Sequence, residues 1–241
     1  MKALYLAWQD PQTRRWYTVG RLGRENGHYL FCYTRGALVP PGFGYLGRMR
    51  DKYQAYHSDK LFPLFANRLL NTSRPEYPDY LAWMGMDDTA SELELLGRSG
   101  GHRATDQLCV YPEVEPDEQG RMALYFFSHG VRYLSDNEQE TLSRLKPGEA
   151  LQLTPEEDNP HDPHALLLET VESVRLGYCP RYLNQDLQLI QQQAALRLTV
   201  EKINLDAPLQ FRLLCKAVFV SPQGFDLYAK EEHQPLAAMA A

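Results

Sequence analysis

The sequence predicts a two-domain α+β protein, and three features of the chain support this fold class. Runs of strand-forming residues separated by turn residues recur in both halves. Apolar residues at helical spacing are concentrated between about 60 and 101 and in short segments of the second half. The segment EVEPDEQGR at 113–121 is acidic and contains proline and glycine, which is typical of a domain boundary. We therefore expect separately folding domains at 1–116 and 120–224, followed by a flexible tail at 225–241.

The first domain should contain an antiparallel sheet followed by helices. Strand composition marks 3–9, 16–22 and 28–34, and Asn26-Gly27 is a strong turn pair between the last two. A loop rich in glycine and proline follows. Helices are expected at 60–70, around 78–86 and at 89–101, the last ending in glycines as helix C-termini commonly do. A short strand at 107–113 completes this domain.

The second domain should contain strands interrupted by two helices. The first strand is expected at 122–130, and a helix follows at 136–145 with Asp136 as N-cap and Gln139 at the capping-box position. A loop of fixed shape is predicted where Asn159-Pro160 and Asp162-Pro163 occur, because proline excludes helical geometry there. The remaining elements are strands at 149–155, 164–170, 173–181, 196–204 and 209–220 and a helix at 184–195.

Composition and charge exclude several classes of function. The net charge of −6 gives no general attraction to nucleic acid or to an anionic membrane. No apolar run approaches the roughly 18 residues that a membrane span needs. The four cysteines, which are Cys32, Cys109, Cys179 and Cys215, are widely spaced without a C-x-x-C pair, which argues against a zinc ribbon or a disulfide framework. We expect them to be buried in a soluble, cytoplasmic protein.

Motifs associated with cofactors or catalysis are weak. The stretch GFGYLG at 42–47 fits G-x-G-x-x-G, but prolines precede it, so a turn is favoured over a nucleotide site. The loop HDPH at 161–164 with Asp158 could bind a divalent metal, but its prolines should hold the ligands apart. Ser128 and His129 are neighbours on a strand and point to opposite faces. We therefore predict a protein that is not an enzyme and has no metal or cofactor.

The stretch YLGRMRDKYQAYH at 45–57 interleaves basic residues with tyrosines. Such residues can contact phosphates and bases or form a protein interface, and the alternative is an exposed loop whose tyrosines pack on the core. We predict a surface for a protein partner, made of Tyr45, Arg48, Arg50, Tyr53 and Tyr56.

The second half resembles a HIRAN domain over about 122–220. The resemblance rests on GVRYL at 130–134, LKPGEALQLTPEEDNPHDPHALLLE at 145–169 and RLGYCPR at 175–181. It implies a small OB-like β-barrel. In fork-remodelling enzymes of the SWI/SNF type, HIRAN domains hold the 3′-hydroxyl end of single-stranded DNA, so the resemblance implies that ligand here.

The resemblance also implies particular DNA-binding residues. Asp162 matches the carboxylate that accepts the hydrogen bond of the terminal hydroxyl. Arg132 and Tyr133 match a pair that contacts phosphate and stacks on a base. Arg181 and Tyr178 are expected to shape the fold, though Arg181 could reach a phosphate. His161 stands where the family usually has tyrosine, and an imidazole offers less stacking area.

Charge restricts the kind of nucleic-acid contact. Residues 121–241 carry 11 Lys and Arg against 16 Asp and Glu, a net −5. Tracking a long stretch of backbone needs a basic groove, so extended duplex binding is disfavoured. A small pocket for one or two terminal nucleotides remains compatible, and so does a HIRAN fold that binds protein instead.

The first half resembles the N-terminal subdomain of HipA-type kinases and the small HipS-like antitoxins over about 1–113. The matching stretches are LYLAW at 4–8, VGRLGRENGHYLFCYT at 19–34, LFPLFANRLL at 61–70 and LELLGRSGGHRATDQLCVYPE at 93–113. The Gly-Ala step usual before the last strand is missing, and RATDQL stands there. The body of a kinase is absent from the chain. The resemblance implies a module that binds a protein partner.

Two functions therefore remain open at this point. The first is a protein that binds single-stranded DNA 3′ ends and is coupled to a partner, either a HipA-like kinase or a DNA-processing enzyme. The alternative is an antitoxin-like regulator of a HipA-type serine/threonine kinase, in which the HIRAN fold serves as a protein-binding scaffold.

Overall fold

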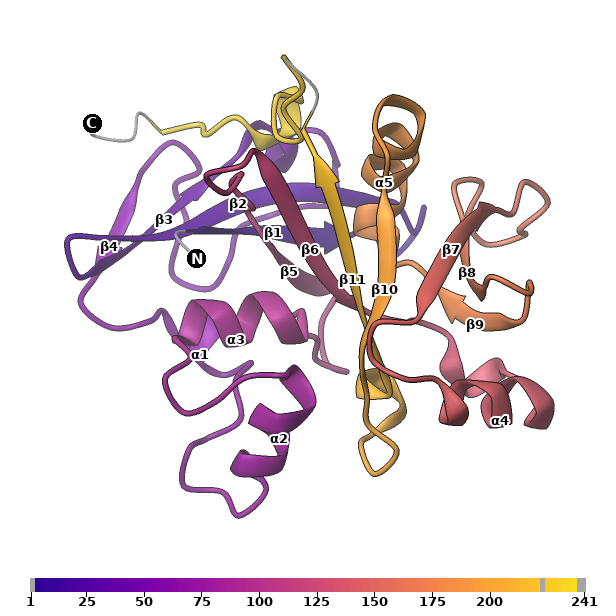
Figure 1. Cartoon of the computed structure of the whole chain (residues 1–241). Helices are drawn as coiled ribbons and strands as arrows, with labels where there is room; N and C mark the ends of the chain where they lie inside the picture. The colour runs from indigo at the N-terminus through magenta and orange to yellow at the C-terminus, as the bar shows by residue number, and fades with distance from the viewer. Residues whose placement is uncertain (1–2, 222–223, 238–241) are drawn as a thin grey trace. The chain divides into compact units, whose positions relative to one another are not determined.

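The computed structural model describes residues 3–221 and 224–237 (Figure 1). The chain forms two compact units that are not simply consecutive. The first unit contains residues up to 78, 87–113 and the chain from 226, and the second contains 79–86 and 114–225. Each unit is built on its own antiparallel sheet. None of the described helices is long and apolar enough to span a bilayer. All four cysteine side chains are buried, as predicted.

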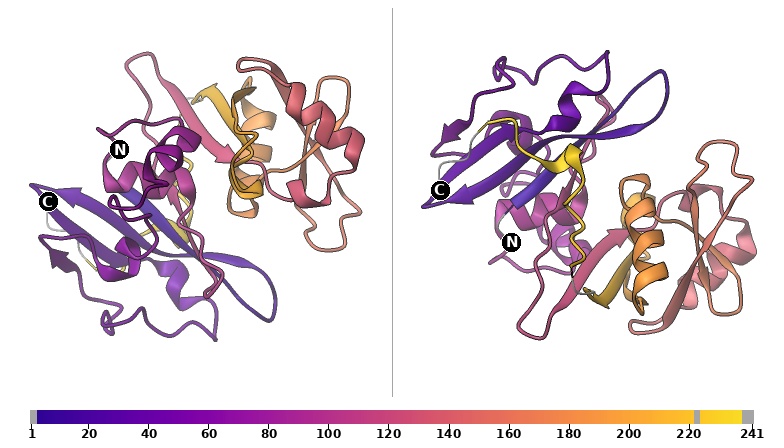
Figure 2. Two further views of the ribbon diagram at one scale, coloured as in Figure 1. Left: turned by 90° about the horizontal axis from the view of Figure 1, so that it is seen from below. Right: turned by 90° about the horizontal axis from the view of Figure 1, so that it is seen from above.

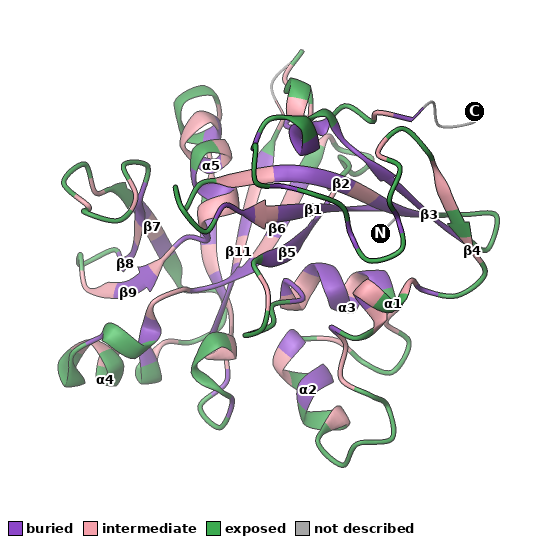
Figure 3. Cartoon of the chain, turned by 180° about the vertical axis from the view of Figure 1, so that it is seen from behind, coloured by how far each residue is buried: buried purple, intermediate pink, exposed green. Residues whose placement is uncertain are grey.

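The first sheet has five strands in the order β4-β3-β2-β1-β5. Its strands are β1 (Ala3–Gln9), β2 (Trp16–Glu25), β3 (His28–Tyr33), β4 (Tyr56–Ser58) and β5 (Leu108–Pro112). β2 and β3 are joined by the predicted tight turn, in which Asn26 and Gly27 both have positive φ, at 50° and 86°. β1 and β5 are almost wholly buried (Figure 3). The predicted antiparallel sheet of the first half is confirmed.

The helices of the first unit are shorter than the sequence predicts. They are α1 (Pro63–Ala66) and α3 (Glu92–Ser99), with a 3-10 turn η1 (Arg35–Leu38) after β3. α1 covers only part of the predicted 60–70, because Pro63 forces the residue before it into an extended conformation and thereby sets the start. α3 has the expected glycine end, since Gly100 adopts the left-handed conformation at φ 73°.

The C-terminal segment is not the loose tail that we predicted. His233 in η4 (Glu231–His233) is only 3% exposed, and its Nε2 lies 3.0 Å from the hydroxyl of Tyr111. The backbone of this segment also bonds the end of β3, with Leu236 N donating to Tyr33 O at 2.8 Å. The yellow segment accordingly runs beside the indigo strands (Figure 2). Residues 238–241 of the predicted tail lie outside the described residues.

The helix α2 (Tyr77–Met84) belongs mostly to the second unit, although it lies within the first predicted domain. The Trp83 ring stacks on Phe211 with 6.3 Å between centroids. Asn204 Nδ2 donates to Trp83 O at 3.0 Å. Independent folding of 1–116 and 120–224 remains a prediction.

The second sheet has six strands in the order β6-β11-β10-β7-β8-β9. Its strands are β6 (Arg121–Phe127), β7 (Ala150–Pro155), β8 (Leu166–Thr170), β9 (Arg175–Tyr178), β10 (Arg197–Ile203) and β11 (Leu213–Val220). Further short helices are η2 (Val131–Tyr133) and η3 (Leu209–Phe211). The longer helices are α4 (Asp136–Arg144) and α5 (Arg181–Gln193).

The N-cap of α4 lies one residue before the predicted one. Ser135 is the N-cap, and its hydroxyl accepts from Glu138 N, while Glu138 Oε2 accepts from Ser135 N at 2.7 Å. The prediction of Asp136 and Gln139 is therefore wrong. Gln139 instead donates from Nε2 to Leu134 O at 2.9 Å. Ser135 is favoured as the N-cap because its capping-box partner, Glu138, also pairs with Arg175 on β9.

A backbone bridge joins the two ends of the second sheet. His129, just after β6, pairs with Tyr178 at the end of β9, through N–H···O bonds of 2.9 and 2.8 Å. Ser128 Oγ adds a bond of 2.8 Å to Leu176 O. This approach requires glycine at 177, because a Cβ there would lie 2.2 Å from Ser128 Oγ and 2.4 Å from His129 O. The sheet is thereby drawn into a half-barrel.

Replacing Gly177 by alanine should strongly destabilise the second unit. The variant combines a clash with a backbone φ of 120° that side chains rarely adopt. We expect a loss of unfolding free energy of more than ~2 kcal/mol, measured by urea denaturation. Gly148→Ala is the matched control, because Gly148 also has a positive φ, 88°, but a Cβ there would meet no atom within 4 Å. Similar losses in the two variants would show that the bridge does not demand glycine.

Candidate nucleic-acid interface

The loop between β7 and β8 is held in one shape by its own polar groups. Glu156 N donates to Ala165 O at 3.0 Å across the base of the loop. Asn159 Oδ1 accepts from His161 N at 2.9 Å and from Asp162 N at 3.0 Å. Asp162 Oδ1 then accepts from His164 N at 3.0 Å. A proline lies inside each of these turns and restricts its backbone, so the bonds and the prolines together define the shape of the loop.

The start of α5 supports this loop from one side. Arg181 Nη2 donates to His161 O at 2.8 Å, and Arg181 Nε lies 3.4 Å from Asp162 Oδ2. Asn184, one turn later, donates from Nδ2 to the same carboxylate oxygen at 2.8 Å. The structure therefore brings together three of the predicted residues, His161, Asp162 and Arg181. Asn184 was not predicted, although its spacing of three from Arg181 places both on one face of a helix.

Arg132 and Tyr133 form the second group of predicted residues. They lie in η2, directly after Gly130, which turns the chain with φ 78°. The guanidinium carbon of Arg132 lies 4.7 Å from the centre of the Tyr133 ring, and Arg132 Nη2 donates to Tyr133 OH at 2.6 Å. The Tyr133 ring is 68% exposed. An exposed aromatic ring beside a guanidinium can stack on a base and contact a phosphate.

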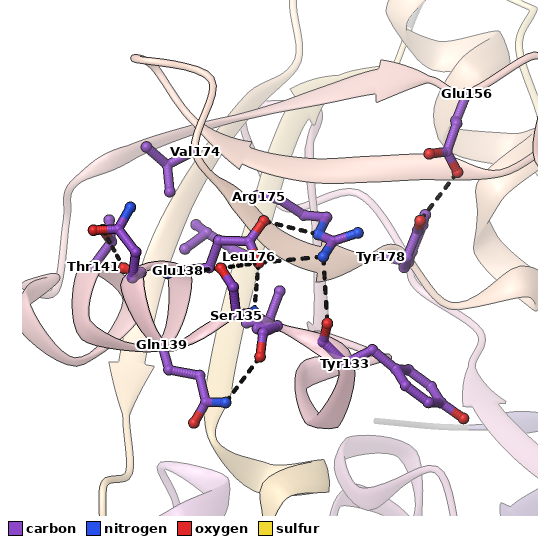
Figure 4. Close-up of polar contacts among 12 residues, drawn as sticks. Tyr133, Ser135, Glu138, Gln139, Thr141, Glu156, Val174, Arg175, Leu176 and Tyr178 are labelled. Carbon is purple, nitrogen blue, oxygen red and sulfur yellow. Dashed lines mark hydrogen bonds and ion pairs between the residues drawn. The ribbon is translucent and has the colours of Figure 1, made fainter.

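An ion pair fixes the backbone of this turn. Arg175 on β9 donates from Nη2 to Tyr133 O at 3.3 Å and pairs with Glu138 on α4 at 3.0 Å. Figure 4 shows the Tyr133 ring pointing away from this ion pair. Burial raises the pKa of Glu138, but bonds from Ser135 and Arg175 outweigh it, so the pKa lies below its ordinary value. Glu138 is therefore ionised at neutral pH and links α4, β9 and η2.

Tyr178 lies between the two groups of predicted residues. Its hydroxyl donates to Glu156 Oε2 at 3.0 Å, and the same carboxylate oxygen accepts from Asn159 Nδ2 (Figure 4 shows the first bond). Its ring lies beside Gly130, where a Cβ would be 3.2 Å from the Tyr178 ring and 3.9 Å from the Tyr133 ring. Burial and the Glu156 carboxylate raise the pKa of Tyr178, so it stays a donor. Among the described residues, no hydrogen bond or ion pair joins the two groups directly.

The predicted partner-binding loop lies in the first unit, and most of its side chains are exposed. Tyr45 is exposed beside Arg50, whose guanidinium carbon lies 5.5 Å from the ring centre, and Arg48 is exposed as well. Tyr56 is half-buried, and its hydroxyl bonds both the N–H and the carbonyl of Asp51, at 2.8 and 2.9 Å. Tyr56 therefore holds the backbone of the loop at Asp51 in place.

Tyr53, in the same loop, lines a cavity. The Tyr53 side chain is 65% exposed. The cavity measures about 500 Å³. Its other lining residues are Arg35, Leu38, Val39, Glu231, Glu232, Pro235 and Leu236. Leu38 and Val39 are themselves 49% and 63% exposed, so apolar surface is concentrated here.

The described ranges contain no group of three or more histidine, cysteine, aspartate or glutamate side chains that could hold a metal ion. The side chains of His161 and His164 are both exposed.

Neutralising Glu138 should remove a pH-dependent contribution to stability. The pKa of Glu138 is lower in the folded protein than in an unfolded chain, so its ionised form stabilises the fold. We expect Glu138→Gln to be less stable than wild type above about pH 5, with the difference shrinking as the pH falls towards about 3. Thermal unfolding followed across this range measures it. Glu140→Gln is the control, since Glu140 pairs with the exposed Arg144 of its own helix. A difference that persists unchanged at acid pH would contradict this role.

Comparison with known proteins gives a family match within the second unit. The family model of the HIRAN domain matches residues 122–218. Two solved structures are also similar. One is a protein from Lactobacillus plantarum, with 28% identity over 42% of this chain and 99% of that chain, at a TM-score of 0.33. The other is the HIRAN domain of human HLTF, with 18% identity over 43% of this chain and 81% of that chain, also at 0.33.

No curated protein matches the chain. The resemblance of residues 1–113 to the HipA N-terminal subdomain receives no support from these comparisons. The predicted resemblance of the second half is confirmed, and it covers both groups of candidate site residues. Residues 122–218 of this chain are a HIRAN domain.

Proposed function

We propose that this protein binds the 3′ end of single-stranded DNA through its HIRAN domain, and that it does so as a binding protein and not as an enzyme. The observation that carries this proposal is that Tyr178 stands between two different recognition groups. One is the rigid loop with Asp162, and the other is the Arg132–Tyr133 pair. The family of the domain supports the same ligand.

The two groups suit different parts of a terminal nucleotide. A carboxylate accepts hydrogen bonds only, so Asp162 suits a hydroxyl donor such as a free 3′-OH. The exposed Tyr133 ring suits a base, and Arg132 suits the adjacent phosphate. His161 is exposed on the same loop and offers a second, smaller ring. Because the domain is acidic overall, few phosphates are neutralised, and affinity should depend only weakly on salt.

A free 3′-hydroxyl should be preferred over a blocked end. A short single strand ending in 3′-OH should bind about tenfold or more tightly than the same strand ending in 3′-phosphate, in a fluorescence titration. The phosphate has no proton to donate at neutral pH and brings negative charge to Asp162. The matched control compares 5′-OH with 5′-phosphate on the same sequence, which should make little difference. Equal affinities for the two 3′ ends would rule out end recognition.

The first unit should supply a partner-binding surface. We propose that the loop carrying Tyr45, Arg48, Arg50, Tyr53 and Tyr56 binds a protein, either a HipA-like kinase or a DNA-processing enzyme. The supporting observation is the exposed Tyr53 at a cavity bordered by exposed Leu38 and Val39. Exposed tyrosine and arginine next to apolar surface are typical of interface hot spots. The second candidate function is an antitoxin-like regulator. In that case this surface would bind a HipA-type kinase, and DNA binding would not be needed.

Substitution in this loop separates the possibilities. In the full-length protein, Tyr53→Ala should abolish or weaken capture of the partner by at least about tenfold and leave 3′-end binding unchanged. Copurification followed by mass spectrometry identifies the partner and measures its capture. Thr89→Ala in the first unit is the control, since its hydroxyl bonds the neighbouring Asp87. Loss of DNA binding with intact capture would instead assign the loop to the nucleic-acid site. No change in either would mean that Tyr53 is only a surface residue.

A further inference from the structure

Asn184 is a buried polar side chain that the proposed function does not yet use. It lies on α5 and is 2% exposed, among the buried apolar residues of that helix. Its amide nitrogen donates to Asp162 Oδ2 at 2.8 Å. Its amide oxygen accepts from Gln185 N at 2.7 Å. The carboxylate can only accept, and so the nitrogen of the amide must face Asp162.

We propose that Asn184 is the positioning residue that fixes Asp162 so that its Oδ1 atom receives the terminal hydroxyl. This inference rests on the proposed function, and it names the atom and the supporting group that determine selectivity for a 3′-OH.

The hydrogen bonds of Asp162 identify Oδ1 as the open acceptor. An ionised carboxylate offers about four acceptor positions, two on each oxygen. Oδ2 accepts one hydrogen bond, from Asn184 Nδ2 at 2.8 Å, and it also faces Arg181 Nε at 3.4 Å in an ion pair. Oδ1 accepts one hydrogen bond, from His164 N at 3.0 Å, and the Arg181 ion pair lies on the other oxygen, so the free position on Oδ1 is the one that no guanidinium faces. A ligand hydroxyl is therefore received at Oδ1, while Oδ2 holds the carboxylate to α5.

Asn184 contributes more to this orientation than Arg181. The Arg181 side chain is 32% exposed, and its 3.4 Å distance is long for a hydrogen bond. Its firmer bond goes to the backbone of His161, at 2.8 Å. The amide of Asn184 is held at both ends and is almost fully buried, so it cannot relax to another partner. Removing it would let the carboxylate rotate about its own side-chain torsions.

The test compares affinities for 3′-OH and 3′-phosphate strands in full-length variants. The measured quantity is a ratio, the dissociation constant of the 3′-phosphate strand divided by that of the 3′-OH strand. Asn184→Ala should lower this ratio by about fivefold or more, because one charge-assisted hydrogen bond no longer orients the acceptor. The binding that remains should still depend on Tyr133, as shown by a further loss in the Tyr133→Ala background. Gln185→Ala, exposed at the next position of the same helix, is the matched control and should leave the ratio unchanged.

An exchange of the two groups distinguishes positioning from folding. Asn184→Asp places a second carboxylate against Asp162 and should abolish the preference for 3′-OH at neutral pH. Combining it with Asp162→Asn exchanges the two groups. The amide at position 162 can then donate to the carboxylate at position 184, and the oxygen of that amide remains to receive the hydroxyl. We expect the double variant to recover part of the ratio and of the melting temperature that Asn184→Asp loses.

Several outcomes would overturn the inference. A wild-type ratio of one would remove the proposed function itself, and this inference with it. A wild-type ratio well above one that is unchanged in Asn184→Ala would leave the function standing and eliminate Asn184 as a positioning residue. An equal fall in affinity for both strands, with no recovery in the double variant, would show that Asn184 serves only the stability of the fold.

Discussion

The backbone bridge between His129 and Tyr178 is the constraint on which the candidate site depends. Its two hydrogen bonds connect the residue after β6 with the end of β9, and the absence of a side chain at Gly177 permits the approach. The bridge has two consequences for function. It brings the turn that carries Arg132 and Tyr133 next to β9. It also places the Tyr178 hydroxyl where Glu156, at the base of the loop, accepts its hydrogen bond.

Local pairing makes the acidic charge of the domain compatible with the proposed DNA site. The carboxylates around the site are not bare, because Glu138 pairs with Arg175, Asp162 pairs with Arg181, and Glu156 accepts from Tyr178. Each of these bonds lowers the negative potential that a phosphate would meet. Arg132 remains exposed with its guanidinium over the Tyr133 ring. Under the proposed function, the net charge of the domain would limit the length of strand that is held more than it would limit binding of the strand end.

Most strands and helices could be predicted because they depend on local pattern, but β4 begins in a stretch that was expected to be a loop. β1 follows from composition alone, and the Asn26-Gly27 turn follows from the need for positive φ at both positions. The N-cap of α4 could not be settled from sequence, because Ser135-x-x-Glu138 and Asp136-x-x-Gln139 overlap as capping boxes. The choice depends on Arg175, a partner far along the chain. The packing of the C-terminal segment could not be predicted for a similar reason, since its buried histidine has no periodic signal.

In the candidate site, too, residues that belong to a local motif could be predicted, and residues that depend on a distant contact could not. The residues of the loop could be recognised from their motif, but a polar residue on α5 reads as ordinary helix surface until the loop is packed against it. The domain boundary is a further example, because the chain passes between the two units at 78, 86, 113 and 225. A cut near 116 would separate Trp83 from Phe211 and Tyr111 from His233. Each unit thus contains a segment that is distant in sequence from the rest of that unit.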